Sequence, residues 1–360
     1  MNLNEVKNIL KNNEFEKVIE LTSDIDQKDK NYIEALFIRG CAHRATGNIT
    51  LAARDWGDAL TKDENNLTIL KSLAQLEYQT RKYNIATNLF NEVVEKDPAD
   101  KDSWYLLSEC LLIQKATEEG FKALNNFINL SLAGEESLNK ACRLLLNRGY
   151  SKEVIALSNK AKKRFSTSTN FSIYEAKAWI KLSHYENGRD CLANDKSAQT
   201  TIEGLLCLAI CYLRLKDAKK CEQYIRIVLQ KEPDNQTANI LLGQTCYSCG
   251  DLQTAITAWK RALYGRAEKP HPEALFWIAK YYFETTHEIR KAAETIELEI
   301  NITNGKREES HYILIASLLG IGNYSDAQKA FLKAKKYFPR SIQIESLKTY
   351  FNESSSCRRD

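Results

Sequence analysis

Proline and glycine are scarce in this 360-residue sequence, with 5 and 14 residues respectively. An all-β fold needs more of these turn-forming residues, so their scarcity favours helices. The sequence also lacks an apolar run of roughly 18 residues, the length that a membrane-spanning helix requires. Its N-terminal end lacks the basic and apolar stretches of a secretory signal. From these two absences we expect a cytoplasmic protein.

Neither sign of charge dominates, because 51 basic residues stand against 47 acidic ones, a formal net charge of +4. A balance so close to neutral gives no general attraction to nucleic acid, so we expect the partner not to be a nucleic acid. Ten cysteines are present. Because long chains without a secretory signal usually keep their thiols reduced, we expect free cysteines.

A repeated pattern runs through the chain. The prolines Pro98, Pro233 and Pro339 each follow a helix-like segment, and counting back 31 residues from each gives starts at residues 67, 202 and 308. Steps of 33 or 34 residues then give further starts at 33, 101, 135, 169 and 236, and one start near 272 follows a short insertion. A single irregular helical domain would not explain such regular steps.

Equivalent positions of the repeats hold similar residues. Positions 4, 7, 8 and 11 share one face of a first helix, and positions 20, 24 and 27 share one face of a second helix. Position 8 is small in eight repeats: Gly40, Ala74, Ser108, Cys142, Ala176, Ala209, Gly243 and Ala279. Position 20 is also small, as in Ala52, Ala86, Cys221, Ala255 and Ala327. Position 24 is large in six: Trp56, Phe90, Leu124, Ile225, Trp259 and Phe331. Gly47, Gly250 and Gly322 at position 15 predict a left-handed end to the first helix.

This pattern resembles the tetratricopeptide repeat. The resemblance implies an all-α, right-handed superhelical solenoid of about nine to ten helix–turn–helix repeats. We expect a truncated repeat over residues 1–32, the solenoid over 33–341, a capping helix over 342–352 that covers the last apolar face, and a frayed tail over 353–360.

Catalytic and metal-binding motifs are missing, so we expect no enzyme activity, no cofactor and no metal site. His43 and His311 fall at packing positions of the repeat. Cys246 and Cys249 form a single C-x-x-C pair on a first helix, and without a second pair we interpret them as ordinary free thiols. We expect the cysteines to be mostly buried, with Cys357 the most reactive.

In the resembled family, positions 2, 5, 9, 12 and 13 of the first helices face the concave groove. Acidic residues fill position 2 in six repeats, and we interpret them as structural because carboxylates are favoured in a first helical turn: Glu34, Asp102, Glu136, Glu203, Glu273 and Glu309. The other positions supply the candidate binding residues Phe37, Arg44, Lys71, Gln75, Tyr78, Tyr105, Arg143, Lys177, Lys181, Arg214, Gln244, Tyr247, Phe276, Lys280, Phe283 and Tyr312. Seven of these are basic, whereas the same positions hold only two acids, Glu109 and Glu284.

Basic and aromatic side chains together suit a partner with acidic and apolar residues. We therefore expect a non-catalytic scaffold that binds a protein or peptide in its groove and takes no small-molecule substrate. The alternatives are a regulatory or targeting subunit of a separate enzyme, such as a glycosyl- or sulfotransferase, and an RNA-binding repeat protein. Self-association through convex or end faces is a further possibility.

Chaperone tails are not the expected partner. Family members that bind them use lysine at position 5, asparagine at position 9, asparagine at position 6 of the next repeat, and lysine and arginine at positions 2 and 6 of the third. Here Lys71 is followed at those positions by Gln75, Leu106, Glu136 and Lys140, so the clamp is incomplete.

Overall fold

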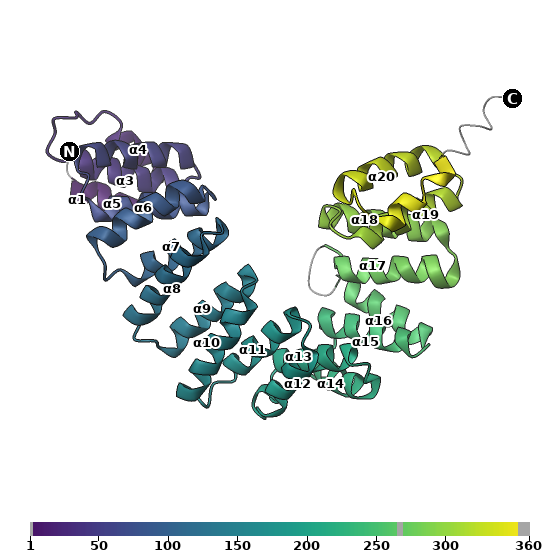
Figure 1. Ribbon diagram of the computed structural model, residues 1–360. Coiled ribbons are helices and arrows are strands. Elements are labelled where there is room, and N and C mark those ends of the chain that lie inside the picture. Colours follow the sequence, from purple (N-terminus) through teal and green to yellow (C-terminus); the bar gives the residue numbers. More distant parts are fainter. Residues whose placement is uncertain (1–2, 265–268, 352–360) are drawn as a thin grey trace. The chain divides into compact units, whose positions relative to one another are not determined.

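The computed structural model describes residues 3–264 and 269–351, and these residues form helices with no β-strand among them. The tail over 353–360 and Cys357 lie outside the described residues. The chain divides into two compact units, Met1–Phe171 and Ser172–Asp360 (Figure 1).

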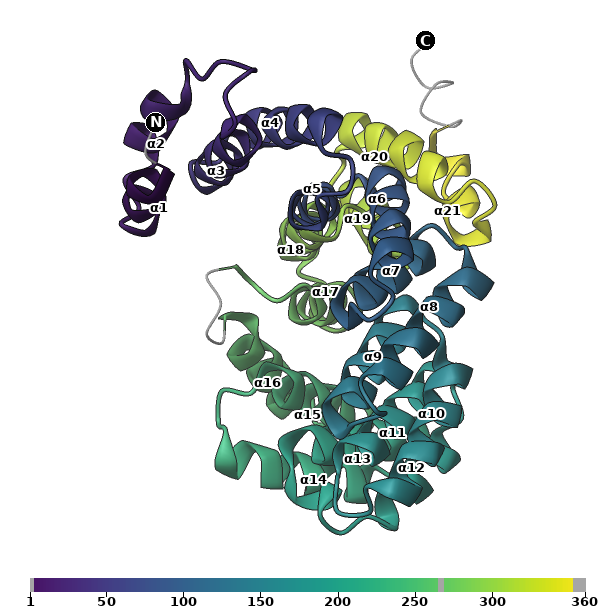
Figure 2. The ribbon, with the colours of Figure 1, turned by 90° about the vertical axis from the view of Figure 1, so that its left-hand side faces the viewer.

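The first unit is a succession of helical hairpins after two short helices. Its helices are α1 (Leu3–Lys11), α2 (Phe15–Thr22), α3 (Tyr32–Ala45), α4 (Ile49–Lys62), α5 (Leu67–Gln79), α6 (Tyr83–Lys96), α7 (Lys101–Ile113), α8 (Thr117–Leu130), α9 (Glu135–Arg148) and α10 (Ser151–Arg164). Consecutive helices from α3 onward pack in pairs, α3 with α4 through α9 with α10 (Figures 1 and 2).

The second unit continues with α11 (Asn170–Lys181), which begins at the unit boundary. There follow α12 (Tyr185–Ala193), the 3-10 turn η1 (Ala198–Thr200), α13 (Ile202–Arg214), α14 (Ala218–Lys231), α15 (Gln236–Ser248), α16 (Leu252–Tyr264), α17 (Pro272–Tyr281), the π-helical turn η2 (Tyr282–Thr286), α18 (Ile289–Thr303), α19 (Glu308–Gly320), α20 (Tyr324–Tyr337) and the short α21 (Ile342–Ser346). The all-α class and the repeat count expected from the sequence are therefore confirmed. Every first helix begins within one residue of a repeat start.

Local chemistry explains where the helices begin and turn. The side chain of Asn235 accepts a hydrogen bond from the backbone N–H of Ala238 at 3.0 Å, which caps α15. Gly47 and Gly250 adopt φ of 81° and 84°, the left-handed conformation expected at position 15. Lys216 adopts φ of 63° at the same position, so the hairpin imposes this turn even on a residue for which it is unfavourable.

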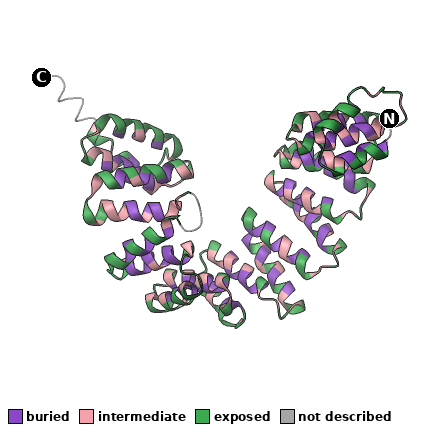
Figure 3. Cartoon of the chain, turned by 180° about the vertical axis from the view of Figure 1, so that it is seen from behind, coloured by how far each residue is buried: buried purple, intermediate pink, exposed green. Residues whose placement is uncertain are grey.

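The helices turn a buried stripe toward their neighbours and an exposed stripe toward solvent (Figure 3). The two helices of a hairpin approach closely where position 8 is glycine. Trp56 and Trp259 at position 24 are fully buried, and a Cβ added to Gly40 or Gly243 would lie 2.2 Å from the indole nitrogen. Each indole N–H donates to the position-5 carbonyl of the first helix, at 3.1 Å for Trp56 and 3.3 Å for Trp259. Glycine at position 8 therefore makes room for tryptophan at position 24.

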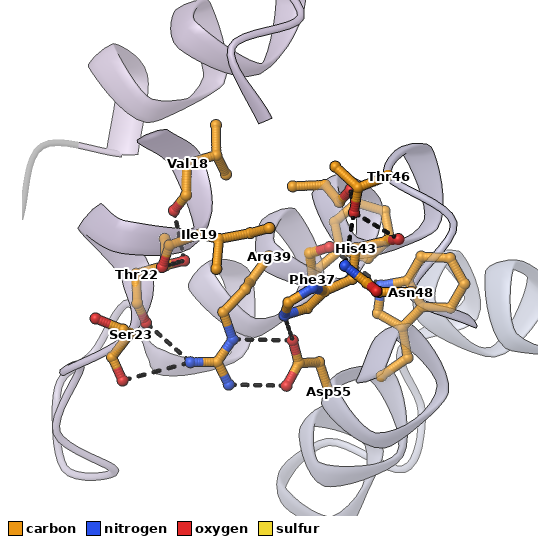
Figure 4. Close-up of polar contacts among 12 residues, drawn as sticks. Val18, Ile19, Thr22, Ser23, Phe37, Arg39, His43, Thr46, Asn48 and Asp55 are labelled. Atoms are coloured by element: carbon orange, nitrogen blue, oxygen red, sulfur yellow. Dashed lines mark hydrogen bonds and ion pairs between the residues drawn. The ribbon is translucent and has the colours of Figure 1, made fainter. Parts of the chain in front are cut away.

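A buried ion pair joins the truncated N-terminal hairpin to the next one (Figure 4). Arg39 donates to both carboxylate oxygens of the fully buried Asp55, at 2.9 and 2.8 Å, and also to the backbone carbonyl of Thr22 at 3.0 Å. The hydrogen bond to Asp55 raises the pKa of Arg39. Arg39 thus donates a hydrogen bond to a backbone carbonyl at the end of α2 that lacks a helical partner. The same guanidinium neutralises the buried carboxylate of Asp55.

Candidate partner-binding surface

The candidate residues lie on first helices, as the repeat phasing requires. In the first unit they come from α3, α5, α7 and α9, and in the second from α11, α13, α15, α17 and α19, with Phe283 on the turn η2. Arg143 belongs to the first unit, whereas Lys177, Lys181 and Arg214 belong to the second. We therefore treat the two sets as separate surfaces.

Three of the predicted basic residues connect successive hairpins. Lys71 pairs with Asp97 at 3.1 Å and with Asp100 at 2.9 Å. Partial burial alone would lower the pKa of Lys71, but the hydrogen bonds to these two carboxylates outweigh it and raise that pKa. Lys71 is therefore engaged in the fold itself.

Lys177 and Lys280 repeat this arrangement in the second unit. Lys177 pairs with Glu203 at 2.8 Å and Lys280 with Glu309 at 2.6 Å. Both acids stand at position 2, which agrees with the structural role expected for them. The pairs are separated by 26 and 29 residues, and a search for opposite charges at that spacing could have found them in the sequence.

The acids in the candidate surface also connect helices. Glu109 on α7 accepts from the Tyr78 hydroxyl at 2.9 Å and from Arg148 at 2.7 Å, which joins α5, α7 and α9. Burial, together with the Glu109 carboxylate, raises the pKa of Tyr78. In the second unit the Tyr247 hydroxyl donates to Glu284 at 3.1 Å. Sequence reasoning missed Arg148, because it falls outside the positions assigned to the groove.

Phe276 is a correction to the sequence expectation. It is only 4% exposed, and the guanidinium of Arg307 lies 3.9 Å from its ring centroid. A covered ring cannot contact a partner, so Phe276 belongs to the core. Four other predicted aromatic residues are half-buried: Phe37, Tyr105, Phe283 and Tyr312. Tyr105 packs on Phe127, for example, with ring centroids 5.1 Å apart.

The remaining candidates keep polar atoms at the surface. Gln75 and Lys181 are exposed and Gln244 is half-buried. Three predicted arginines are exposed and form no ion pair with any residue that the structure describes: Arg44, Arg143 and Arg214. These arginines are exposed positive charges among the predicted site residues.

Comparison with known proteins agrees with this geometry. A tetratricopeptide-repeat family model matches residues 72–126, which span α5 to α8. A tetratricopeptide-repeat protein from Parabacteroides merdae superposes with a TM-score of 0.52 at 12% sequence identity, covering 80% of this chain and 99% of its own. Residues 72–126 therefore match the tetratricopeptide-repeat family, and the described helices share the fold of tetratricopeptide-repeat proteins.

Other solved structures share the fold. The Cut9–Hcn1 hetero-tetramer of the APC/C matches with a TM-score of 0.56 at 11% identity, over 95% of this chain and 81% of the other. Yeast Tom70 matches with a TM-score of 0.56 at 14% identity, over 99% and 88% respectively. No curated protein sequence matches the chain. At such identities these likenesses concern the fold alone.

The two histidines at packing positions of the repeat pack as expected. His43 is 7% exposed and His311 is 1% exposed, and burial lowers the pKa of both. His311 lies 3.1 Å from the carbonyl of Gly305. Within the described residues no group of three or more His, Cys, Asp or Glu side chains could hold a metal ion.

The cysteines are mostly buried, which confirms that expectation: six of the nine described free cysteines are buried. In the C-x-x-C pair Cys246 is buried and Cys249 exposed, and burial raises the pKa of Cys246 to about 11. Its thiol therefore stays protonated at neutral pH. None of the described helices is both long enough and apolar enough to cross a membrane.

Proposed function

We propose that this tetratricopeptide-repeat protein is a non-catalytic, cytosolic scaffold whose first helices bind a protein or peptide partner. The observation that carries the proposal is the set of unpaired, exposed arginines beside half-buried apolar residues. On α13, for example, Arg214 is exposed and its neighbour Leu213 is half-buried. A segment with acidic and apolar side chains complements both.

The ion pairs reduce the number of basic residues that are available to a partner. Lys71, Lys177 and Lys280 already have carboxylate partners, so recruiting them would break contacts between hairpins. Arg143 in the first unit and Arg214 in the second carry no such cost. One of the solved structures with this fold is a hetero-tetramer, which supports a role in holding another protein.

The test begins with affinity capture of partners by the full-length chain, read by mass spectrometry. We expect Arg214→Glu to weaken the captured partner's binding about tenfold or more in titrations of the purified pair. Lys219→Glu is the matched control, because Lys219 is exposed on α14 of the same repeat but outside the first helix. Arg143→Glu tests the first unit in the same way, with Lys122→Glu on α8 as its control.

Added salt should weaken binding as well, because exposed charges are screened beyond a Debye length of roughly 8 Å at physiological ionic strength. If neither added salt nor the two arginine-to-glutamate substitutions change the affinity, the partner does not bind through the first helices. The identity of the captured protein also separates a free scaffold from a subunit of an enzyme, and capture of RNA alone would refute the proposal.

A further inference from the structure

The turn between α8 and α9 differs from equivalent turns in other repeats. Position 32 holds proline in three repeats, at Pro98, Pro233 and Pro339, but leucine at Leu132. The Leu132 side chain is 82% exposed, and its backbone has φ of 53°. An exposed leucine in the left-handed region is unfavourable both for hydration and for backbone geometry. Such an outlier is a reason to look for a function.

The neighbours of Leu132 extend this feature. Leu130 at the end of α8 is 40% exposed, and Glu135 and Glu136 are exposed in the first turn of α9. We call Leu130, Leu132, Glu135 and Glu136 the acidic leucine turn. It presents apolar side chains together with two exposed carboxylates, of which Glu136 pairs with Lys140 at 3.2 Å on the surface of α9.

An apolar cleft lies in the same unit, between the second helices α8 and α10. Its volume is about 240 Å³. Its apolar lining comes from Phe121, Leu124, Ile128, Leu145, Ala156 and Leu157. A void of roughly 150 Å³ with such a lining can hold a benzene molecule, so this cleft has room for a leucine side chain.

The helix α10, which forms one side of the cleft, carries several positive charges. Lys152, Lys160, Lys163 and Arg164 on α10 are exposed, and none forms an ion pair with a residue in the described part of the chain. Lys160 and Lys163 follow Lys152 by 8 and 11 residues, which places the three lysines on one face of the helix. We call these four residues the basic stripe. Lys160 also lines the cleft, where Glu153 is the one acid.

The turn and the C-terminal part of the stripe, Lys160, Lys163 and Arg164, lie at the same end of the hairpins. Four residues separate the end of α8 from the start of α9, and α10 packs against α9 and returns to that end (Figure 1). One edge of the unit therefore carries an acidic apolar projection, the C-terminal part of the basic stripe and an apolar cleft. A surface that holds both a projection and its complement can pair with itself about a two-fold axis.

We propose that the first unit binds a second copy of this chain through this edge. Leu132 of one copy enters the α8–α10 cleft of the other, while Glu135 and Glu136 face Lys160 and Lys163 of the partner. The two-fold axis repeats this contact, with Leu132 of the second copy in the cleft of the first. This contact uses the turn, the second helices α8 and α10 and the first turn of α9. It includes none of the partner-binding residues proposed above.

Sedimentation velocity over a concentration series of the full-length chain tests the pairing. We expect a concentration-dependent dimer whose dissociation constant rises about tenfold or more in Leu132→Ser, because the cleft loses its apolar occupant. Ile342→Ser is the matched control, since Ile342 is 85% exposed but lies in the second unit. It should leave the dissociation constant unchanged.

Charge exchange is the sharper test. Lys160→Glu/Lys163→Glu alone and Glu135→Lys/Glu136→Lys alone should each weaken the dimer, because like charges then face each other. An equimolar mixture of the two variants should restore it, since both contacts of the mixed dimer again join opposite charges. Unchanged far-ultraviolet circular dichroism confirms that each variant is folded.

Three results would overturn the proposal: a monomer up to about 100 μM, a dimer indifferent to Leu132→Ser, or a mixture that fails to recover pairing. Loss of partner capture in Arg214→Glu with an intact dimer would leave this proposal standing, so the two proposals fail separately.

Discussion

Gly243→Ala tests the explanation given for the close helix contacts. Alanine is normally favoured over glycine in a helix by about 1 kcal/mol, so the substitution should stabilise an open position. At Gly243 the new Cβ would lie 2.2 Å from the Trp259 indole nitrogen and 2.5 Å from its Cδ1 atom. Trp259 is fully buried and donates to the Ile240 carbonyl at 3.3 Å, so the ring has no free space into which to move.

The expected change in the free energy of unfolding is the sum of an overpacking cost, a lost hydrogen bond and a gain in helix propensity. Overpacking of this kind costs about 1–3 kcal/mol, and losing the indole hydrogen bond costs about 1 kcal/mol more. Subtracting the helix-propensity gain leaves a net destabilisation of about 1–3 kcal/mol. For a unit of this size that lowers the melting temperature by roughly 2–4 °C per kcal/mol.

The repeat that starts at residue 67 suggests the compensating change, because it pairs Ala74 at position 8 with Phe90 at position 24. In a Trp259→Phe background Gly243→Ala should cost nothing further or should stabilise. The double-mutant cycle should therefore show a favourable coupling of about 1–3 kcal/mol.

Urea unfolding followed by circular dichroism measures all four proteins, and Gly57→Ala is the control. Gly57 lies within α4, and a Cβ added there meets no atom within 4 Å, so this variant should gain about 0.5–1 kcal/mol. If Gly243→Ala stabilises as much as Gly57→Ala, or if Trp259→Phe gives no relief, the reasoning about positions 8 and 24 is wrong.

Other predictions concern buried side chains. Ala86→Leu and Ala255→Leu, at fully buried positions, should each cost about 1–3 kcal/mol in thermal unfolding, and unchanged melting temperatures would contradict the helix pairing. Burial raises the pKa of Glu299, so the folded state binds its proton more tightly than the unfolded state does. The contribution of Glu299 to the free energy of unfolding should therefore be most favourable below about pH 4.5 and should decline as pH rises through the folded-state pKa. Glu299→Gln should remove that decline in urea titrations at several pH values, and an identical pH profile would refute the assignment. Among the described cysteines, thiol reagents should label Cys249 first and Cys246 slowly, as peptide mass mapping would show.

The sequence alone determined the repeat boundaries, because the contacts that define a hairpin are local. A small residue at position 8 and a large one at position 24 lie 16 residues apart, and the turn between them is short, so their pattern predicts the pairing directly. Gly47 and Gly250 likewise marked left-handed turns that the structure confirms.

Tertiary structure decided which predicted surface residues are available. Phe276 follows the groove pattern, yet Arg307 from the segment before α19 covers its ring. The periodic pattern shows only the direction of a side chain from its own helix. Whether a charge is free depends on the next hairpin, as the pairs of Lys177 with Glu203 and Lys280 with Glu309 illustrate. The distance between two residues that are 26 to 29 positions apart in the sequence depends on how successive hairpins stack. The periodic pattern of a single helix does not determine that stacking.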